Sequence, residues 1–380
     1  MTADNSRTAL VLPGGGARAA YQAGVLAAIR DMLPNATVNP FPILCGTSAG
    51  AINALTLACH AENFRGAVET LNDVWRNMHA HHVYRSDPIG VAASGARWLS
   101  SLALGWFIRK SPRSLLDNDP LRQLLAHRLD FGNIDRSIAS GSLHAVSVTA
   151  SGYTSGHSVT FFQARADVDT WTRTHRFGCR DRLGVEHLMA SAAIPFVFPA
   201  IKLNREWFGD GSMRQLAPVS PAIHLGAEKI LVIGAGRISE QIERRRGESY
   251  PTLAQIAGHA LSSIFLDGLS VDIERMQRIN RTLSVIPDEV KAGAGIALRP
   301  IETLVIAPSE RLDFLAARHA RALPPAVRVL LRGMGAMNRT GGALVSYLLF
   351  EQPYTRALID LGYRDTEKVR DEVRAFLGIS

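Results

Sequence analysis

The stretch Phe41-Pro42-Ile43-Leu44-Cys45-Gly46-Thr47-Ser48-Ala49-Gly50 runs from an apolar segment into a turn of small residues. Residues 41–45 are expected to form a buried strand, and a helix is expected over 51–60. The turn between them fits the pattern G-x-S-x-G, in which small neighbours allow a sharp bend that leaves the serine hydroxyl accessible. This context favours Ser48 as a nucleophile, with Gly46 and Gly50 flanking it.

A similar junction of strand, glycine turn and helix comes earlier in the chain. Residues 8–13 are apolar, residues 17–32 carry apolar side chains at helical spacing, and Gly14-Gly15-Gly16 lies between them. Two such units in succession are typical of an α/β fold. We therefore expect a three-layer α/β/α architecture with a mostly parallel central sheet and a helical C-terminal extension.

The chain is expected to divide after this α/β domain. The domain is assigned to residues 8–236, and residues 237–380 are assigned to a mostly helical extension packed on it, because helical patterns dominate there. One short strand is expected at 303–307, and it can pair back into the first sheet.

Gly14, Gly15 and Gly16 expose backbone N–H groups at the start of a helix, an arrangement that binds anions. The anion can be a nucleotide phosphate or the oxyanion of an acyl-transfer intermediate. The dinucleotide pattern is incomplete, since Ala19 takes the place of its third glycine and no acidic residue ends the second strand. Together with Ser48 this favours an oxyanion hole, and a non-catalytic nucleotide-binding protein is the alternative.

A serine nucleophile needs a base to accept its proton, and histidine usually fills that role. None of the 12 histidines stands in a glycine-flanked turn. Asp210 does, within Gly209-Asp210-Gly211-Ser212, although an Asp-Gly pair alone commonly marks a β-turn. The residues by themselves leave both interpretations of Asp210 open.

Five separated segments together resemble the patatin-like phospholipase family: Gly14 to Arg18, the G-x-S-x-G turn, Asp210-Gly211, and residues 116–121 and 191–199. The resemblance implies a Ser48–Asp210 dyad that acts without histidine. It also implies an oxyanion hole formed by the glycine loop, with Ala49 as a further donor. An esterase or phospholipase A-type lipid acyl hydrolase is therefore expected, with a thioester, triacylglycerol or storage polyester as alternative substrates.

Three residues in or next to these segments have roles that the resemblance leaves open. Arg18 is expected either to bind a substrate phosphate or to hold the glycine loop in place. Ala19 and Ser212 replace other small residues usual in the family. Ser212 is expected to form a hydrogen bond with Asp210 and lower its basicity.

Charge and composition bear on the partners of the protein. The chain has 380 residues and a formal net charge of +8, which favours an anionic partner such as a membrane surface. The basic residues are dispersed, so no nucleic-acid partner is expected. Residues 89–113 combine an apolar run with tryptophans and basic residues, which fits either an interfacial membrane segment or a buried helix pair.

No cofactor and no metal ion are expected. The three cysteines have no paired spacing, and the cluster of His79, His81 and His82 lacks a nearby carboxylate pattern. The polar N-terminus does not read as a signal peptide, and no uninterrupted apolar stretch has the length of a membrane span. We expect a cytoplasmic protein, with peripheral contact at the inner membrane face as an option.

Overall fold

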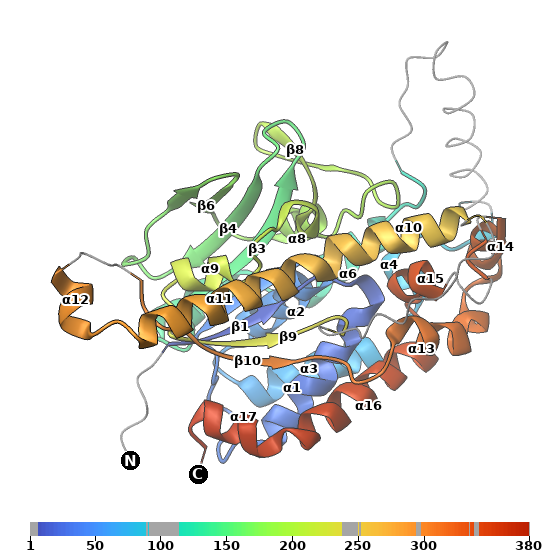
Figure 1. Cartoon of the computed structure of the whole chain (residues 1–380). Helices are drawn as coiled ribbons and strands as arrows, with labels where there is room; N and C mark the ends of the chain where they lie inside the picture. The colour runs from blue at the N-terminus through green and yellow to red at the C-terminus, as the bar shows by residue number, and fades with distance from the viewer. Residues whose placement is uncertain are drawn as a thin grey trace.

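The computed structural model describes residues 7–88, 90, 114–237, 250, 252–293, 298–333, 335–337 and 342–379. In these residues a ten-stranded, mostly parallel sheet lies between layers of helices (Figure 1). The predicted three-layer α/β/α fold is thereby confirmed. The expected membrane or core segment at 89–113 lies outside the described residues, apart from Gly90.

Five strands run parallel to one another in the spatial order β10-β9-β1-β2-β3. They are β1 (Thr8–Leu12), β2 (Ile43–Thr47), β3 (Ala145–Gly152), β9 (Lys229–Ile233) and β10 (Glu302–Ile306). β1 and β2 are buried along their whole length, as expected for strands covered on both faces. The late strand β10 pairs with β9, so the C-terminal region contributes to the sheet as well as to the helical layers.

The remaining strands extend the sheet beyond β3 and make it mixed. They are β4 (Ser158–Ala164), β5 (Trp171–Arg173), β6 (Arg176–Arg180), β7 (Ile201–Leu203) and β8 (Glu206–Asp210). β4 and β8 both pair antiparallel with β3, β4 along its length and β8 at its C-terminal end. The C-terminal end of β3 is therefore the place where the sheet brings β8 beside β2.

One face of the parallel strands is covered by four helices from both ends of the chain (Figure 1). They are α1 (Ala20–Met32), α2 (Ala49–Cys59), α3 (Phe64–Arg76) and α16 (Gln352–Lys368). α1 and α16 cross at glycines: a Cβ atom on Gly24 would lie 1.9 Å from the Ile359 carbonyl oxygen, and one on Gly362 would lie 2.2 Å from that of Tyr21. This close crossing fixes the C-terminal region against the sheet.

The opposite face is covered mainly by α9 (Ser220–His224) and by a long helix. The long helix consists of α10 (Leu253–Ser262), a π-helical turn at Ser263–Asp267 and α11 (Gly268–Ser284). By length and composition, Leu253–Ser284 could cross a membrane, with a mean hydropathy of 1.2 over 18 residues. Core helices of soluble proteins pass the same test, and this helix buries Phe265, Leu269 and Ile273 against the rest of the chain.

The other described helices are short connectors or parts of the C-terminal region: α4 (Ala80–Val83), α6 (Asp119–Arg128), α7 (Gly132–Ala139), α8 (Val185–Ser191), α12 (Asp288–Gly293), α13 (Leu312–His319), α14 (Pro325–Gly333), α15 (Gly342–Leu348) and α17 (Arg370–Leu377), with 3-10 turns η1 (Gly16–Ala19), η2 (Gly211–Arg214) and η4 (Ala320–Ala322). The pattern over residues 61–82 suggests a single helix. The structure instead breaks it between α3 and α4, because Asn77 leaves the helical conformation and donates its side-chain amide to the Asp73 carbonyl.

Candidate active site

Ser48 occupies the sharp turn between β2 and α2. Its backbone angles are φ 54° and ψ −130°, which are unfavourable for a residue with a side chain. Small neighbours make the turn possible: a Cβ atom on Gly50 would lie 2.1 Å from the Leu12 carbonyl oxygen, and one on Gly46 would lie 2.4 Å from the Cα atom of Ala51. The strand, turn and helix predicted around Ser48 are therefore present, with the strain typical of a nucleophile turn.

The sheet brings Asp210 next to this turn. Thr47, at the end of β2, pairs with Thr149 of β3, and the next residue of β3, Ala150, pairs with Asp210 at the end of β8. The Ser48 hydroxyl donates a 2.6 Å hydrogen bond to Oδ2 of Asp210. Residues 162 positions apart thus meet through two neighbouring strand pairings.

Burial of the pair alters the acidity of the carboxyl group. Asp210 is fully buried, and burial raises its pKa from 3.8 to about 6. Hydrogen bonds from Ser48 and from the Ser212 backbone N–H, the latter 2.9 Å from Oδ1, oppose part of that rise. The hydrogen bond between Ser212 and Asp210 is made by the backbone N–H, which any residue at this position supplies, and the buried Ser212 hydroxyl has no hydrogen-bond partner among the described residues.

Ser191 at the end of α8 links the Ser48 turn to β3 by two hydrogen bonds. The Ser48 backbone N–H donates to the Ser191 hydroxyl at 2.7 Å, and that hydroxyl donates to the Thr149 carbonyl at 2.6 Å. Ser191 is fully buried. In the sequence Ser191 belongs to the 191–199 segment, and no local pattern singles it out, because its partners lie in the Ser48 turn and on β3.

The glycine loop lies directly beside Ser48. A Cβ atom on Gly14 would lie 2.8 Å from the Ser48 Cβ, and one on Gly15 would lie 2.6 Å from that of Ala235. Gly16 has a φ of +54°, a conformation that favours glycine, and it begins η1, so the loop leads directly into a helical segment whose first N–H groups lack an intrahelical partner. Gly16, Ser48 and Ala49 all line one cavity, whereas Gly15, also predicted as an oxyanion donor, is not among the residues that line it.

Arg18 faces the C-terminal region rather than open space. Its Nε donates to the Ser346 hydroxyl at 2.9 Å, and its guanidinium carbon lies 4.0 Å from the centre of the Tyr347 ring. The side chain is only 4% exposed. Phe265 of the π-helical turn stacks on the same tyrosine, with ring centres 5.1 Å apart. Of the two expected roles for Arg18, its contacts match the structural one.

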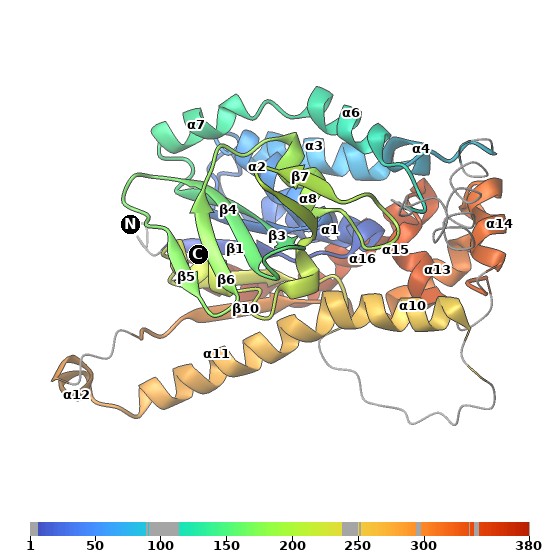
Figure 2. The ribbon, with the colours of Figure 1, turned by 90° about the horizontal axis from the view of Figure 1, so that it is seen from above.

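The cavity beside Ser48 is predominantly apolar. It extends between α2, α3 and α6, which lie side by side in Figure 2. Ser48 and Ala49 lie at one part of its wall, and most of the remaining wall is made of apolar side chains: Ile52, Leu71, Val74, Trp75, Met78, Val83, Leu121, Leu124, Leu125, Leu129, Ile194, Phe198 and Phe350. Such a lining accepts an apolar chain and offers a charged ligand little compensation for lost hydration.

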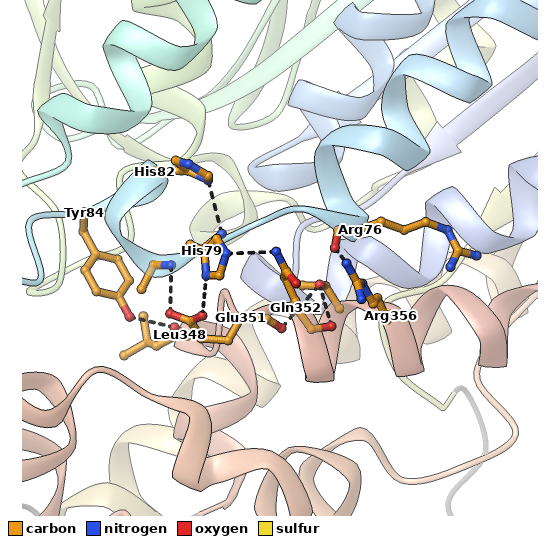
Figure 3. A network of polar contacts seen from close by, with 10 residues as sticks. Arg76, His79, His82, Tyr84, Leu348, Glu351, Gln352 and Arg356 are labelled. Atoms are coloured by element: carbon orange, nitrogen blue, oxygen red, sulfur yellow. Dashed lines mark hydrogen bonds and ion pairs between the residues drawn. The ribbon is translucent and has the colours of Figure 1, made fainter.

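A polar network fixes one wall of this cavity (Figure 3). His79 contacts Glu351 through Nδ1 at 2.8 Å and Gln352 through Nε2 at 2.9 Å. The Tyr84 hydroxyl donates to the Leu348 carbonyl at 2.9 Å. These bonds tie the segment around α4 to the junction of α15 and α16, which carries Phe350 into the cavity wall. The histidine cluster that raised the question of a metal site is thus engaged by protein groups.

Comparison with known proteins gives three findings. Residues 10–223 match the family model for patatin-like phospholipase. A cGAMP-activated phospholipase of Pseudomonas aeruginosa is 28% identical over 216 residues, which are 57% of this chain and 55% of that protein. The chain therefore matches little more than half the length of this relative. The crystal structure of VipD from Legionella pneumophila aligns with a TM-score of 0.37 and 11% identity, covering 97% of this chain and 67% of VipD.

The family match covers more than half of the chain and includes the glycine loop, Ser48 and Asp210. It also agrees with the mostly parallel sheet between helical layers. Members of this family act as lipid acyl hydrolases. The chain belongs to the patatin-like phospholipase family.

Proposed function

We propose that this protein is a serine esterase or phospholipase A-type lipid acyl hydrolase, with Ser48 as nucleophile and Asp210 as its base. The observation that carries the proposal is the 2.6 Å hydrogen bond between the Ser48 hydroxyl and the Asp210 carboxylate, at a strained turn beside an apolar cavity. Acyl esters have both parts that this arrangement suits, a carbonyl for the serine and a hydrocarbon chain for the cavity.

The reaction proceeds through an acyl-enzyme. Asp210 accepts the Ser48 proton while the Ser48 oxygen attacks the ester carbonyl. Backbone N–H groups of Gly15, Gly16 and Ala49 stabilise the oxyanion. When the intermediate collapses, the C–O bond to the alcohol breaks and Asp210 returns the proton to the leaving oxygen. Water then attacks the acyl-enzyme while Asp210 takes its proton; the C–O bond to Ser48 breaks, Asp210 returns the proton to the serine oxygen, and the carboxylic acid is released.

The pKa of Asp210 supports its role as the base. A carboxylate with an ordinary pKa is a weak acceptor for a serine proton, and burial raises the pKa of Asp210 to about 6. The group is then still ionised at neutral pH, yet more basic than an exposed aspartate. The backbone N–H of Ser212 donates a hydrogen bond to Oδ1 of Asp210. This bond orients the carboxylate so that its other oxygen, Oδ2, accepts the hydrogen bond from Ser48.

Among the alternatives, the cavity favours substrates with long apolar acyl chains. Thioesters, triacylglycerols and polyesters share the same reacting carbonyl, so these substrates differ in leaving group rather than in the chemistry of the dyad. A nucleotide-binding role for the glycine loop is less well supported, because Gly16 opens toward the mostly apolar cavity. The cGAMP activation named for the Pseudomonas relative belongs to that protein, which this chain matches over only part of its length.

We also propose that the protein works at a lipid surface on the cytoplasmic side of the membrane. Phe196 is 80% exposed and lies in the same turn as Ile194 and Phe198, which line the cavity. An exposed aromatic side chain next to a lipid cavity is suited to the membrane interface. Flotation with phosphatidylglycerol-containing vesicles tests this idea. Phe196→Ser should reduce binding, and unchanged binding would speak against contact through this turn.

Labelling with a fluorophosphonate probe tests the hydrolase proposal. Wild type should be labelled at Ser48 and should hydrolyse p-nitrophenyl butyrate, whereas Ser48→Ala should lose both properties and keep its circular dichroism spectrum. Ser155→Ala, which changes a serine in an exposed turn, is the matched control and should behave as wild type. Labelling or hydrolysis that survives in Ser48→Ala would refute the assignment.

A further inference from the structure

A second cavity lies away from Ser48, between the β5–β6 hairpin, α9 and α11. Figure 1 shows β6, α9 and α11 at the same end of the molecule. Four arginines line the cavity: Arg173 and Arg176 from the hairpin, Arg275 from α11, and Arg299 from the segment before β10. We call this cavity the arginine groove. Asp272 is the single carboxylate among the described residues that line it.

The positive charge of the arginine groove is only partly neutralised within the described ranges, since one carboxylate faces four arginines. Arg173 donates to the Thr172 carbonyl at 3.0 Å, and Arg299 donates to the Ala227 carbonyl at 2.9 Å, so both bind neutral acceptors. Asp272 is buried, and its Oδ2 accepts the Val219 backbone N–H at 3.0 Å. None of the four arginines forms an ion pair with a carboxylate in the part of the chain that the structure describes.

His224 also lines the arginine groove, and its pKa responds to the positive charge of the neighbouring arginines. Burial and, after it, the charges of Arg173 and Arg176 together lower its pKa to about 4. Holding several like charges around one cavity costs free energy in the empty protein. An anion bound among the arginines would offset this repulsion. The arrangement is therefore suited to binding an anion.

The lining also indicates the chemical class of the anion. Guanidinium groups match the oxygens of phosphate in a planar, two-point geometry. Met276, Ile279 and Leu298 add an apolar strip to the same cavity. Arginines beside an apolar strip suit an organic phosphate ester, in which a charged group is joined to a less polar body.

The arginine groove connects to the catalytic turn through a short series of contacts. Asp272 holds Val219 by the hydrogen bond given above, and Val219 follows the 3-10 turn η2 that begins after Asp210. Earlier in the same segment, the Gln215 side chain accepts a 2.8 Å hydrogen bond from the hydroxyl of Thr47, the residue before Ser48. α11 also begins against this segment, since a Cβ atom on Gly268 would lie 2.9 Å from the Gln215 carbonyl oxygen.

We propose that the arginine groove is an effector site for a phosphate-bearing organic anion, whose binding changes the rate of hydrolysis at Ser48. An anion drawn toward Arg275 and Arg176 competes with Asp272 for their charge, and Asp272 is the residue that positions Val219. The binding half of the proposal stands without any hydrolase activity, and the regulatory half rests on the function proposed above.

Binding is tested with the full chain and three probes: inorganic pyrophosphate, ATP, and phosphatidylcholine vesicles with or without phosphatidylglycerol. Wild type should bind at least one phosphate probe with saturation at a single site, measured by calorimetry for the soluble probes and by flotation for vesicles. Saturation by ATP or pyrophosphate identifies a soluble source. Binding confined to phosphatidylglycerol vesicles identifies a lipid headgroup.

A double substitution locates the site. Arg176→Gln with Arg275→Gln should weaken binding by at least about tenfold, since each charge-assisted hydrogen bond contributes strongly. Arg278→Gln with Arg281→Gln removes the same charge from α11 outside the arginine groove and should leave binding unchanged. If both double variants lose the same amount of binding, or if wild type binds none of the probes, the assignment of the arginine groove as the binding site is overturned.

The regulatory half has a separate readout. The probe that binds should change the rate of p-nitrophenyl butyrate hydrolysis by at least about twofold in wild type and in the Arg278/Arg281 control, a coupling small on the usual scale. The same probe should leave the rate of hydrolysis by the Arg176/Arg275 variant unchanged. Saturating binding with an unchanged rate would overturn the regulatory half. If wild type binds but shows no hydrolysis at all, the failure is that of the proposed function.

Discussion

Oδ2 of Asp210 accepts a 2.6 Å hydrogen bond from the hydroxyl of Ser48, and both side chains are at most 1% exposed. The pair is enclosed by the glycine loop, by Ser191 and by the backbone of Ser212. The enclosure raises the basicity of the carboxylate and holds the hydroxyl in one direction. Its consequences for pH dependence, stability and substrate range can each be measured.

Hydrolysis should rise with pH through about 6 and then level off. Asp210 accepts the serine proton only when it is ionised, and burial raises its pKa to about 6. The pH profile of kcat/KM for p-nitrophenyl butyrate reports this ionisation in the free enzyme. A profile that stays flat from pH 4 to pH 8 would contradict the assignment of Asp210 as the base.

Asp210→Asn should abolish hydrolysis and stabilise the fold above about pH 6. The native carboxyl keeps its proton up to about pH 6, whereas the unfolded chain releases it near 3.8, so wild-type stability falls as pH rises through this window. The difference corresponds to about 3 kcal/mol at most. Urea unfolding at about pH 8 should show the variant to be more stable, with a smaller difference near pH 4.

The matched control for that experiment is Asp360→Asn on the exposed side of α16, where the carboxylate pairs with Arg76 at 3.3 Å. Because both partners of this ion pair are about half exposed, the substitution should change neither activity nor the pH dependence of stability. An Asp210→Asn variant that is less stable than wild type at high pH would show that hydrogen bonding outweighs the burial of charge.

Arg18→Lys should lower kcat about tenfold or more while affecting phosphate-bearing and phosphate-free esters alike. The lysine keeps the charge but loses the Nε bond to Ser346 and the planar stacking on Tyr347, so the glycine loop is less well fixed. The measurement compares kcat and KM for p-nitrophenyl butyrate and for a short-chain phosphatidylcholine. A rise in KM restricted to the phospholipid would instead assign Arg18 to the substrate phosphate.

Val74→Phe should restrict the length of the acyl chain that the enzyme accepts. Val74 on α3 lines the cavity and is half-buried, so a larger side chain fills space that a long chain would use. Hydrolysis of p-nitrophenyl laurate should fall about tenfold or more, while that of the acetate stays near wild type. Val271→Phe, at an exposed position of α11, should leave both rates unchanged. An equal loss for both esters would argue against the cavity as the acyl site.

Local signals in the sequence were sufficient for the elements nearest the chemistry. The turn at Ser48 was predictable because its glycines and the flanking apolar runs are contiguous in the chain. The single helix expected over 61–82 was wrong, since the break near Asn77 depends on one side chain bonding the backbone. The roles of Ser191 and Tyr347 were missed because both residues act through partners far away in sequence.

The sequence by itself determined the α/β class, the strained turn at Ser48 and the glycine loop before it, because these follow from residue size and apolar periodicity over short distances. Only the tertiary structure decided which group meets Ser48 and what Arg18 holds. The pairing of β3 with both β2 and β8 brings Asp210 to the serine, and the packing of α15 against η1 brings Tyr347 to Arg18. Both contacts join distant segments, whose meeting depends on the packing of the whole sheet and its helices.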